Sequence, residues 1–157
     1  MENSIIFNKI LIAVDDSKFS YAAAEYGFKL AKSLGSEVAL VHISAYPITT
    51  SMTGDPILGD PGIIIPDMMD AQREAAKQLF QKLREELGQN VTVSEFILEG
   101  NVKDEVINVA QEFNASLIVM GTHSRKGLDL FLSGSVAESV MRNSNCPVLV
   151  IPHKEKE

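Results

Sequence analysis

Residues 9–43, KILIAVDDSKFSYAAAEYGFKLAKSLGSEVALVHI, decide the fold, because they contain a strand, a helix and a second strand in succession. The first run, Lys9–Val14, is short, apolar and bounded by polar residues, as expected for a strand buried on both faces. Asp16 or Ser17 can cap the helix that follows, and Leu34-Gly35 ends it. A second buried strand is predicted over residues 37–43. The stretch therefore predicts one β-α-β unit of a parallel sheet.

The remainder of the chain continues this alternation after a segment, residues 44–66, that holds four of the six prolines. That segment is long for a loop in a compact domain, and its apolar residues 62–65 are expected to pack on something. The residues expected to face inward on a long helix starting at Asp67 are Met68, Ala71, Ala75, Leu79, Leu83 and Leu87. The elements predicted further along are a strand over 91–98, a helix after Asn101, a strand over 116–120, a helix from Ser135 and a strand over 147–151. Strict alternation of this kind predicts an α/β fold, in which a parallel sheet carries helices on both faces.

Composition limits the classes of protein and partner. The chain has 157 residues, of which 45% are hydrophobic and 22% charged, and this predicts a single domain over residues 1–157. The net charge of −7 argues against nucleic acid or an anionic membrane as the main partner. The single cysteine, Cys146, excludes an internal disulfide framework and is expected to be a small buried residue at the start of a strand. The N-terminus has no basic start of a secretory signal, so a cytoplasmic protein is predicted.

Two polar segments follow strands at their carboxyl ends, where ligands of parallel sheets bind. Gly134 precedes Ser135, so a phosphate could approach the free amides at the start of the last helix, with Gly121 and the cations Arg125 and Lys126 nearby. Alternatively, Ser135 only caps that helix in a glycine-rich connection. Asp15 directly follows the first strand, a position that suits both hydrogen bonding to ribose hydroxyls and capping of the next helix.

The sequence favours binding over catalysis. The three histidines, His42, His123 and His153, have no spacing typical of metal ligands, and His42 within a strand is expected to be structural. The signatures of P-loop, dinucleotide-binding, serine hydrolase and zinc protease sites are absent, and no nucleophile–base pair is evident. We therefore assign neither catalytic residues nor metal ligands.

The chain resembles the universal stress protein family, whose ATP-binding members carry Gly-x2-Gly-x9-Gly-Ser/Thr after the fourth strand. Gly121 matches the first position, Ser124 replaces the second glycine, and Gly134-Ser135 match the end after nine residues. The segments that resemble the family as well are Ile12–Asp15, Leu40–Ile43 and Asn145–Val150. The resemblance covers nearly the whole chain.

The resemblance implies a Rossmann-like domain with a five-stranded parallel sheet of order 3-2-1-4-5, similar to the adenine nucleotide alpha hydrolases. The implied binding residues are Ala13, Asp15 and Ile43 around the adenosine, Met120 and Gly121 beside the ribose, and Gly134, Ser135 and Val136 at the phosphates, with Ser124 and Arg125 in the same loop. In such members a magnesium ion can bridge the phosphates. Members of the family also form homodimers through the last strand, here residues 147–151.

Ser124 is the departure from the family pattern. If this position needs a positive φ, serine costs on the order of 1 kcal/mol relative to glycine, which is about tenfold in affinity. A hydroxyl that donates to a phosphate would recover part of that loss. The sequence thus predicts a stress-response module that binds ATP or AMP as a nucleotide-linked switch, with at most slow hydrolysis. The alternatives are a nucleotide-free dimeric interaction protein of the same fold and, with less support, an ATP-consuming enzyme of a related fold.

Overall fold

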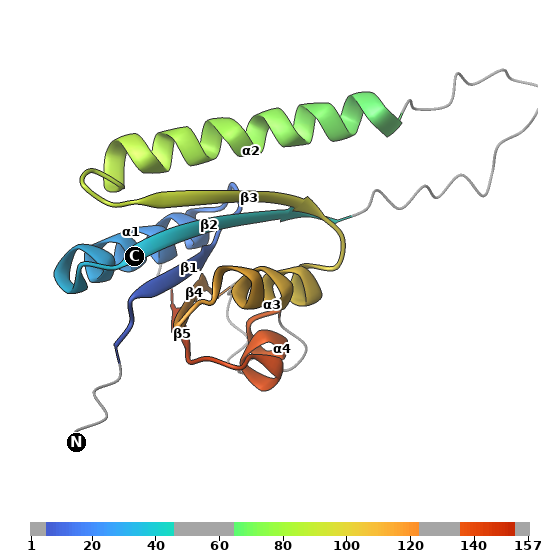
Figure 1. Ribbon diagram of the computed structural model, residues 1–157. Helices are drawn as coiled ribbons and strands as arrows, with labels where there is room; N and C mark the ends of the chain where they lie inside the picture. Colours follow the sequence, from blue (N-terminus) through green and yellow to red (C-terminus); the bar gives the residue numbers. More distant parts are fainter. Residues whose placement is uncertain (1–5, 46–64, 123–135, 153–157) are drawn as a thin grey trace, which may run out of the picture.

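The computed structural model describes residues 6–45, 65–122 and 136–152 and has a five-stranded sheet with helices on both faces (Figure 1). Its strands are β1 (Lys9–Ala13), β2 (Glu37–Ser44), β3 (Val93–Glu99), β4 (Leu117–Gly121) and β5 (Val148–Ile151). Its helices are α1 (Lys18–Leu34), α2 (Ile65–Leu87), α3 (Val102–Phe113) and α4 (Val136–Asn143). The order is β3-β2-β1-β4-β5 and every neighbouring pair is parallel, which confirms the predicted fold class and strand order.

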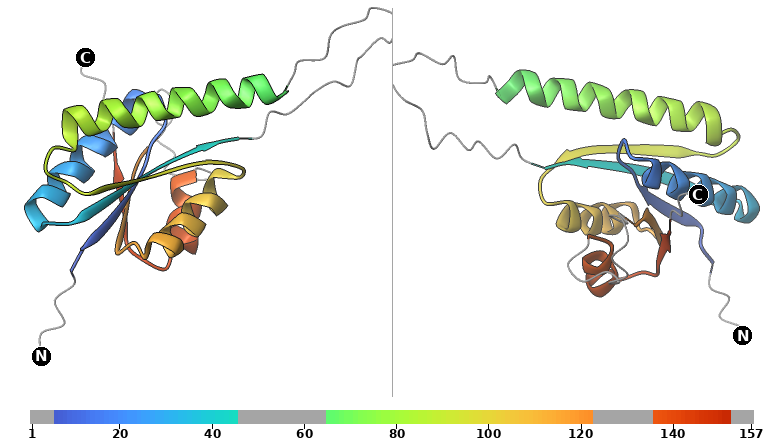
Figure 2. Two further views of the ribbon diagram at one scale, coloured as in Figure 1. Left: turned by 45° about the horizontal axis from the view of Figure 1, so that its top comes forward. Right: turned by 180° about the vertical axis from the view of Figure 1, so that it is seen from behind.

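The sheet separates two hydrophobic cores, because successive side chains of a strand point to opposite faces. Ile10 and Ile12 of β1 belong to the core under α1 and α2, together with Phe28 and Phe80. Leu11 between them belongs to the core under α3 and α4. Figure 2 shows α1 and α2 on one side of the sheet and α3 and α4 on the other. Each strand in the middle of the sheet is thus buried on both faces, as its apolar run predicts.

Helix boundaries follow the capping residues that the sequence predicts. The Ser17 hydroxyl oxygen accepts a hydrogen bond from the Ser20 amide at 3.2 Å, and the Asn101 side-chain oxygen accepts one from the Asp104 amide at 3.2 Å. Gly35 ends α1 in the left-handed conformation, with φ of 67°. Of the two caps considered for α1, Ser17 is therefore the one used.

The predicted inner face of α2 is partly wrong. The helix begins at Ile65, two residues before Asp67. Its buried residues are Ala76, Phe80 and Leu83, with Leu79 and Leu87 partly buried, whereas Met68, Ala71 and Ala75 are exposed. Among the described side chains, those that pack on the core thus lie in the second half of α2, where Leu79, Leu83 and Leu87 confirm the prediction and Ala76 and Phe80 were missed. A periodic pattern that offers two overlapping apolar stripes does not show which one a neighbouring sheet will cover.

In α1 the helical spacing predicts an inner face of Tyr21, Ala24, Phe28 and Ala31, and all but Tyr21 are buried. Tyr21 is 37% exposed. Its hydroxyl donates a 2.8 Å hydrogen bond to Glu86 of α2, and this bond raises the pKa of Tyr21. In α4 the buried residues are Ala137 and Val140. None of the described helices is long and apolar enough to cross a membrane.

Candidate functional site

The topology predicts a crevice between the carboxyl ends of β1 and β4. These strands are neighbours in the sheet, but β1 leads into α1 on one face and β4 leads towards α4 on the other. The helices that follow these two strands therefore lie on opposite faces of the sheet, which is the arrangement typical of a ligand crevice in parallel sheets. Residues 13–15 and 120–122 lie on its two sides, because Ile12 pairs with Val119 in the ladder.

Three of the predicted site residues lie on one face of the sheet at this edge. Met120 is buried in the core under α3 and α4, and Ala13 and Ile43 are partly buried against the same core. They come from three adjacent strands, β2, β1 and β4. Ala13, Ile43 and Met120, which are far apart in the sequence, thus form one apolar surface at the carboxyl edge of the sheet, which we call the apolar floor.

Asp15 lies in a turn that several hydrogen bonds hold between β1 and α1. Its amide donates to the Ser20 hydroxyl at 2.7 Å, and its carboxylate accepts from the Ser17 amide at 2.8 Å. One residue earlier, the Val14 amide donates to the Val41 carbonyl at 2.9 Å. Asp15 therefore supports the start of α1 from outside the helix while Ser17 caps it, and it stays half-buried beside the crevice.

Gly121 has a role in packing that the sequence did not indicate. It lies at the end of β4, on the face covered by α1. A Cβ atom at this position would lie 2.6 Å from the carbonyl oxygen of Phe19 and 2.9 Å from its carbonyl carbon. Glycine is thus required for the first turn of α1 to approach β4 this closely. Because the Asp15 turn is bonded to that first part of α1, the close approach places the turn beside the crevice.

His42 has a structural bond, as expected, but its partner could not be foreseen from the sequence. Its Nδ1 lies 3.0 Å from the Val14 carbonyl oxygen, and its Nε2 lies 3.4 Å from the Ser44 hydroxyl. A carbonyl oxygen only accepts hydrogen bonds, so Nδ1 is the protonated nitrogen of the ring. His42 therefore links the end of β2 to the residue that precedes Asp15.

Four predicted phosphate-loop residues lie outside the described residues: Ser124, Arg125, Gly134 and Ser135. So does the segment 46–64 with its apolar residues 62–64. Val136 is described and is the first residue of α4, where its side chain is 41% exposed. Because α4 connects two parallel strands, its N-terminus faces the same edge of the sheet as Asp15.

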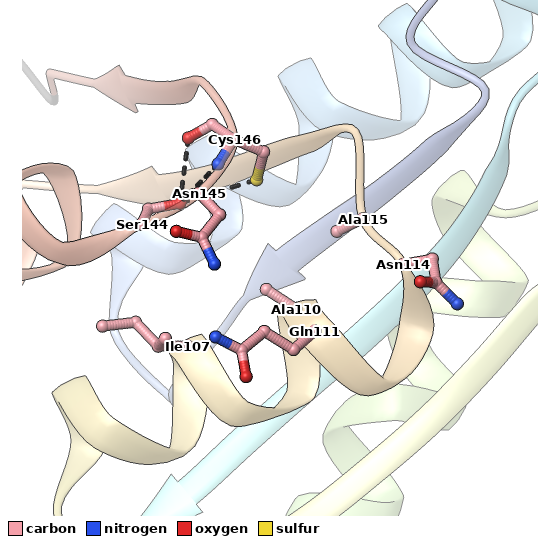
Figure 3. A pocket seen from close by; sticks show the side chains of 8 residues that line it. All are labelled: Ile107, Ala110, Gln111, Asn114, Ala115, Ser144, Asn145 and Cys146. Carbon is pink, nitrogen blue, oxygen red and sulfur yellow. Dashed lines mark hydrogen bonds between the residues drawn. The ribbon is translucent and has the colours of Figure 1, made fainter.

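Cys146 is half-buried and lies away from the crevice. It lines a pocket of about 280 Å³ between α3 and the turn that joins α4 to β5 (Figure 3). The Ser144 hydroxyl accepts a hydrogen bond from the Cys146 amide at 3.2 Å and donates to the Cys146 carbonyl at 2.9 Å. The pocket also includes Ala115, just before β4, and so lies at the amino edge of the sheet. The described residues contain no cluster of three histidine, cysteine or carboxylate side chains that could hold a metal ion.

Comparisons with known proteins agree on one family. Residues 7–152 match the model of the universal stress protein family. A universal stress protein of Methanocaldococcus jannaschii, MJ0531, is 35% identical over 97% of this chain and 86% of its own length. Among solved structures, MJ0577 of the same organism has a TM-score of 0.75 at 25% identity, over 96% of this chain and 99% of its own. A universal stress protein from Archaeoglobus fulgidus, solved in complex with dAMP, has a TM-score of 0.60 at 24% identity, over 92% of this chain and 98% of its own.

Proposed function

Because this chain belongs to the universal stress protein family, we propose that it binds an adenine nucleotide, ATP or AMP, between the carboxyl ends of β1 and β4. The observation that carries the proposal is the convergence of Ala13, Ile43 and Met120 on one apolar floor beside the Asp15 turn. Apolar surface flanked by a few polar groups is typical of sites for small ligands. The dAMP complex of the Archaeoglobus protein gives further support from the same fold.

In this proposal the base lies on the apolar floor of Ala13, Ile43 and Met120. The Asp15 carboxylate accepts hydrogen bonds from the ribose hydroxyls, next to the backbone of Met120 and Gly121. The proposed phosphate ligands are Ser124, Arg125, Gly134, Ser135 and Val136. The start of a helix such as α4 suits this task, because its first amides have no partner within the helix and the helix dipole attracts anions.

Magnesium would enter with the nucleotide. The described residues offer no cluster of three suitable side chains, and Mg²⁺ is commonly held by one or two carboxylates together with phosphates and water. Asp15 is a carboxylate beside the proposed ribose position. The bound ion would neutralise part of the phosphate charge, which favours binding to a chain with a net charge of −7.

We expect the wild-type protein, purified without added nucleotide and then stripped, to bind Mg-ATP with micromolar affinity. Ser124→Gly should bind up to about tenfold more tightly if serine strains the phosphate loop at a positive φ. Mass spectrometry of the denatured protein would identify any co-purified nucleotide, and calorimetry would give the dissociation constants. The absence of binding by both wild type and Ser124→Gly would contradict the proposal and favour a nucleotide-free interaction protein.

We also propose that the protein forms a homodimer through β5, over residues 147–151. β5 is an edge strand, and Leu149 on it is 39% exposed. The Pro147 and Ile151 carbonyls accept hydrogen bonds from the amides of Ile118 and Thr122. By the alternation of a parallel ladder, the main-chain groups of Val148 and Val150 therefore point away from the sheet. Such unpaired edge groups can pair with the same strand of a second copy.

Val150→Pro should therefore convert the dimer to a monomer with little loss of stability, because proline removes an outward N–H and leaves the β4 ladder intact. Leu149→Pro is the matched control. Its amide points towards β4, so proline there should lower the melting temperature of the fold. Sedimentation velocity and thermal melts distinguish the two effects. A wild-type protein that sediments as a monomer would show the dimer proposal to be wrong.

A further inference from the structure

β1 and β2 separate at the carboxyl edge of the sheet, where the proposed nucleotide lies. Their ladder ends with the pair Ala13 and Val41, whereas β2 continues beside β3 as far as Ser44. Asp15 and Ile43 therefore lie two residues beyond the last pair, on separate branches. We call this point, between residues 13–15 and residues 41–43, the strand fork. The spacing of its branches determines how far Ile43 lies from the Asp15 turn.

The side chain of His42 bridges the strand fork. His42 Nδ1 donates to the Val14 carbonyl oxygen at 3.0 Å, beyond the backbone bond from the Val14 amide to Val41. Side chains alternate along β2, so His42 points to the face of α1 and α2, opposite to Ile43. The bridge therefore joins the branches from behind and leaves the apolar floor clear.

The other side of the turn is fixed by α1. The Asp15 amide donates to the Ser20 hydroxyl, and the side chain of Ser20 is buried among the first turns of the helix. Ser20 thus holds the turn to α1. The His42 bridge relates the position of the turn to that of Ile43, one residue further along β2 than the backbone bond from Val14 to Val41.

We propose that His42 is a positioning residue that sets the width of the strand fork and so the fit of the nucleotide base between Asp15 and Ile43. This inference rests on the proposed nucleotide site. His42 does not touch the nucleotide. It acts through Val14, whose carbonyl it holds at a fixed distance from β2 while the adjacent residues, Ala13 and Asp15, face the ligand.

The test compares two substitutions at His42 with a control at the opposite edge of the sheet. His42→Phe keeps a ring of similar size but has no donor, whereas His42→Asn places an N–H at the position of Nδ1. Ser116→Ala is the control, because the Ser116 hydroxyl bridges the amide and carbonyl of Lys9 at 3.0 and 2.9 Å, at the amino end of β1. It removes a comparable bridge between strand ends, away from the site.

Two readouts are taken: the dissociation constant of Mg-ATP, and the hydrogen exchange of the Val14 and Asp15 amides in nucleotide-free protein. We expect His42→Phe to weaken Mg-ATP binding about tenfold and to speed exchange at both amides. His42→Asn should restore both values to near those of wild type. Ser116→Ala should lower the melting temperature but leave the affinity and the exchange of these two amides unchanged.

Wild-type affinity and unchanged exchange in His42→Phe would overturn the inference. Equal effects of His42→Phe and Ser116→Ala on affinity would also overturn it, since they would indicate a general loss of stability. If wild type itself binds no ATP, the proposed function fails. The exchange readout then still decides whether His42 holds the strand fork.

Discussion

Replacing Phe80 by alanine is expected to lower the free energy of unfolding by about 3–5 kcal/mol, the usual cost of removing a buried aromatic ring. Phe80 is fully buried and is the largest side chain that α2 contributes to its core. Among the described side chains of α2, Ala76 and Leu83 are the others that are fully buried, with Leu79 and Leu87 partly buried, so the ring supplies a large share of the contact between α2 and the core. Denaturant unfolding, followed by circular dichroism, measures the loss.

The control for Phe80→Ala is Met68→Ala, on the same helix. Met68 is 42% exposed and makes no part of the core, so its truncation should change the free energy of unfolding by no more than about 0.5 kcal/mol. The sequence pattern alone places Met68 on the inner face of the helix and Phe80 outside it. It therefore predicts a larger loss of stability for Met68→Ala than for Phe80→Ala. A loss at Met68 comparable to that at Phe80 would mean that the first half of α2 is also packed.

Replacing Gly121 by valine is expected to damage both stability and binding. The new Cβ would lie 2.6 Å from the Phe19 carbonyl oxygen, and this main-chain atom cannot move without shifting the first turn of α1. Overpacking of this kind costs about 1–3 kcal/mol. The shift also displaces the Asp15 turn, which Ser20 of α1 holds. We therefore expect Mg-ATP affinity to fall by more than about tenfold, and Gly121→Ala to act in the same direction with smaller size.

Gly35→Ala is the matched control for Gly121. Gly35 has a φ of 67°, and no atom lies within 4 Å of a Cβ built there, so alanine costs about 1 kcal/mol through backbone strain alone. This substitution lies at the end of α1 that is remote from the crevice. It should destabilise the protein and leave nucleotide affinity unchanged. Normal ATP binding by Gly121→Val would contradict the role assigned to the Gly121–Phe19 contact.

Much of the fold could be predicted from short-range features of the sequence. The buried strands are continuous apolar runs, and Ser17, Gly35 and Asn101 act within a few residues of their own positions. The strand order came from the family resemblance, since alternation alone fixes parallel pairing but not which strands are neighbours. The inward stripes of α1, α2 and α4 were less predictable, because they depend on where the sheet lies beneath each helix.

The residues of the candidate site could be proposed from the sequence, but their contacts could not. The family resemblance implied Ala13, Ile43 and Met120, and the apolar runs place them at strand ends. His42 bonds to Val14, which is 28 positions away in the sequence. Gly121 packs against Phe19, which is 102 positions away. No local pattern encodes such pairs. They arise because the sheet places β1 between β2 and β4.

The contact between Gly121 and Phe19 also constrains how the crevice can respond to ligands. On the β1 side, α1 touches the end of β4 without room for a methyl group, and His42 ties the same turn to β2. The carboxyl ends of β1, β2 and β4 are therefore held together with the first turn of α1 as one rigid unit. The carboxyl ends of β1 and β4 therefore have little room to move relative to one another. In the proposed nucleotide site, adaptation to nucleotides of different length, such as AMP and ATP, would then fall to the phosphate end, at the start of α4.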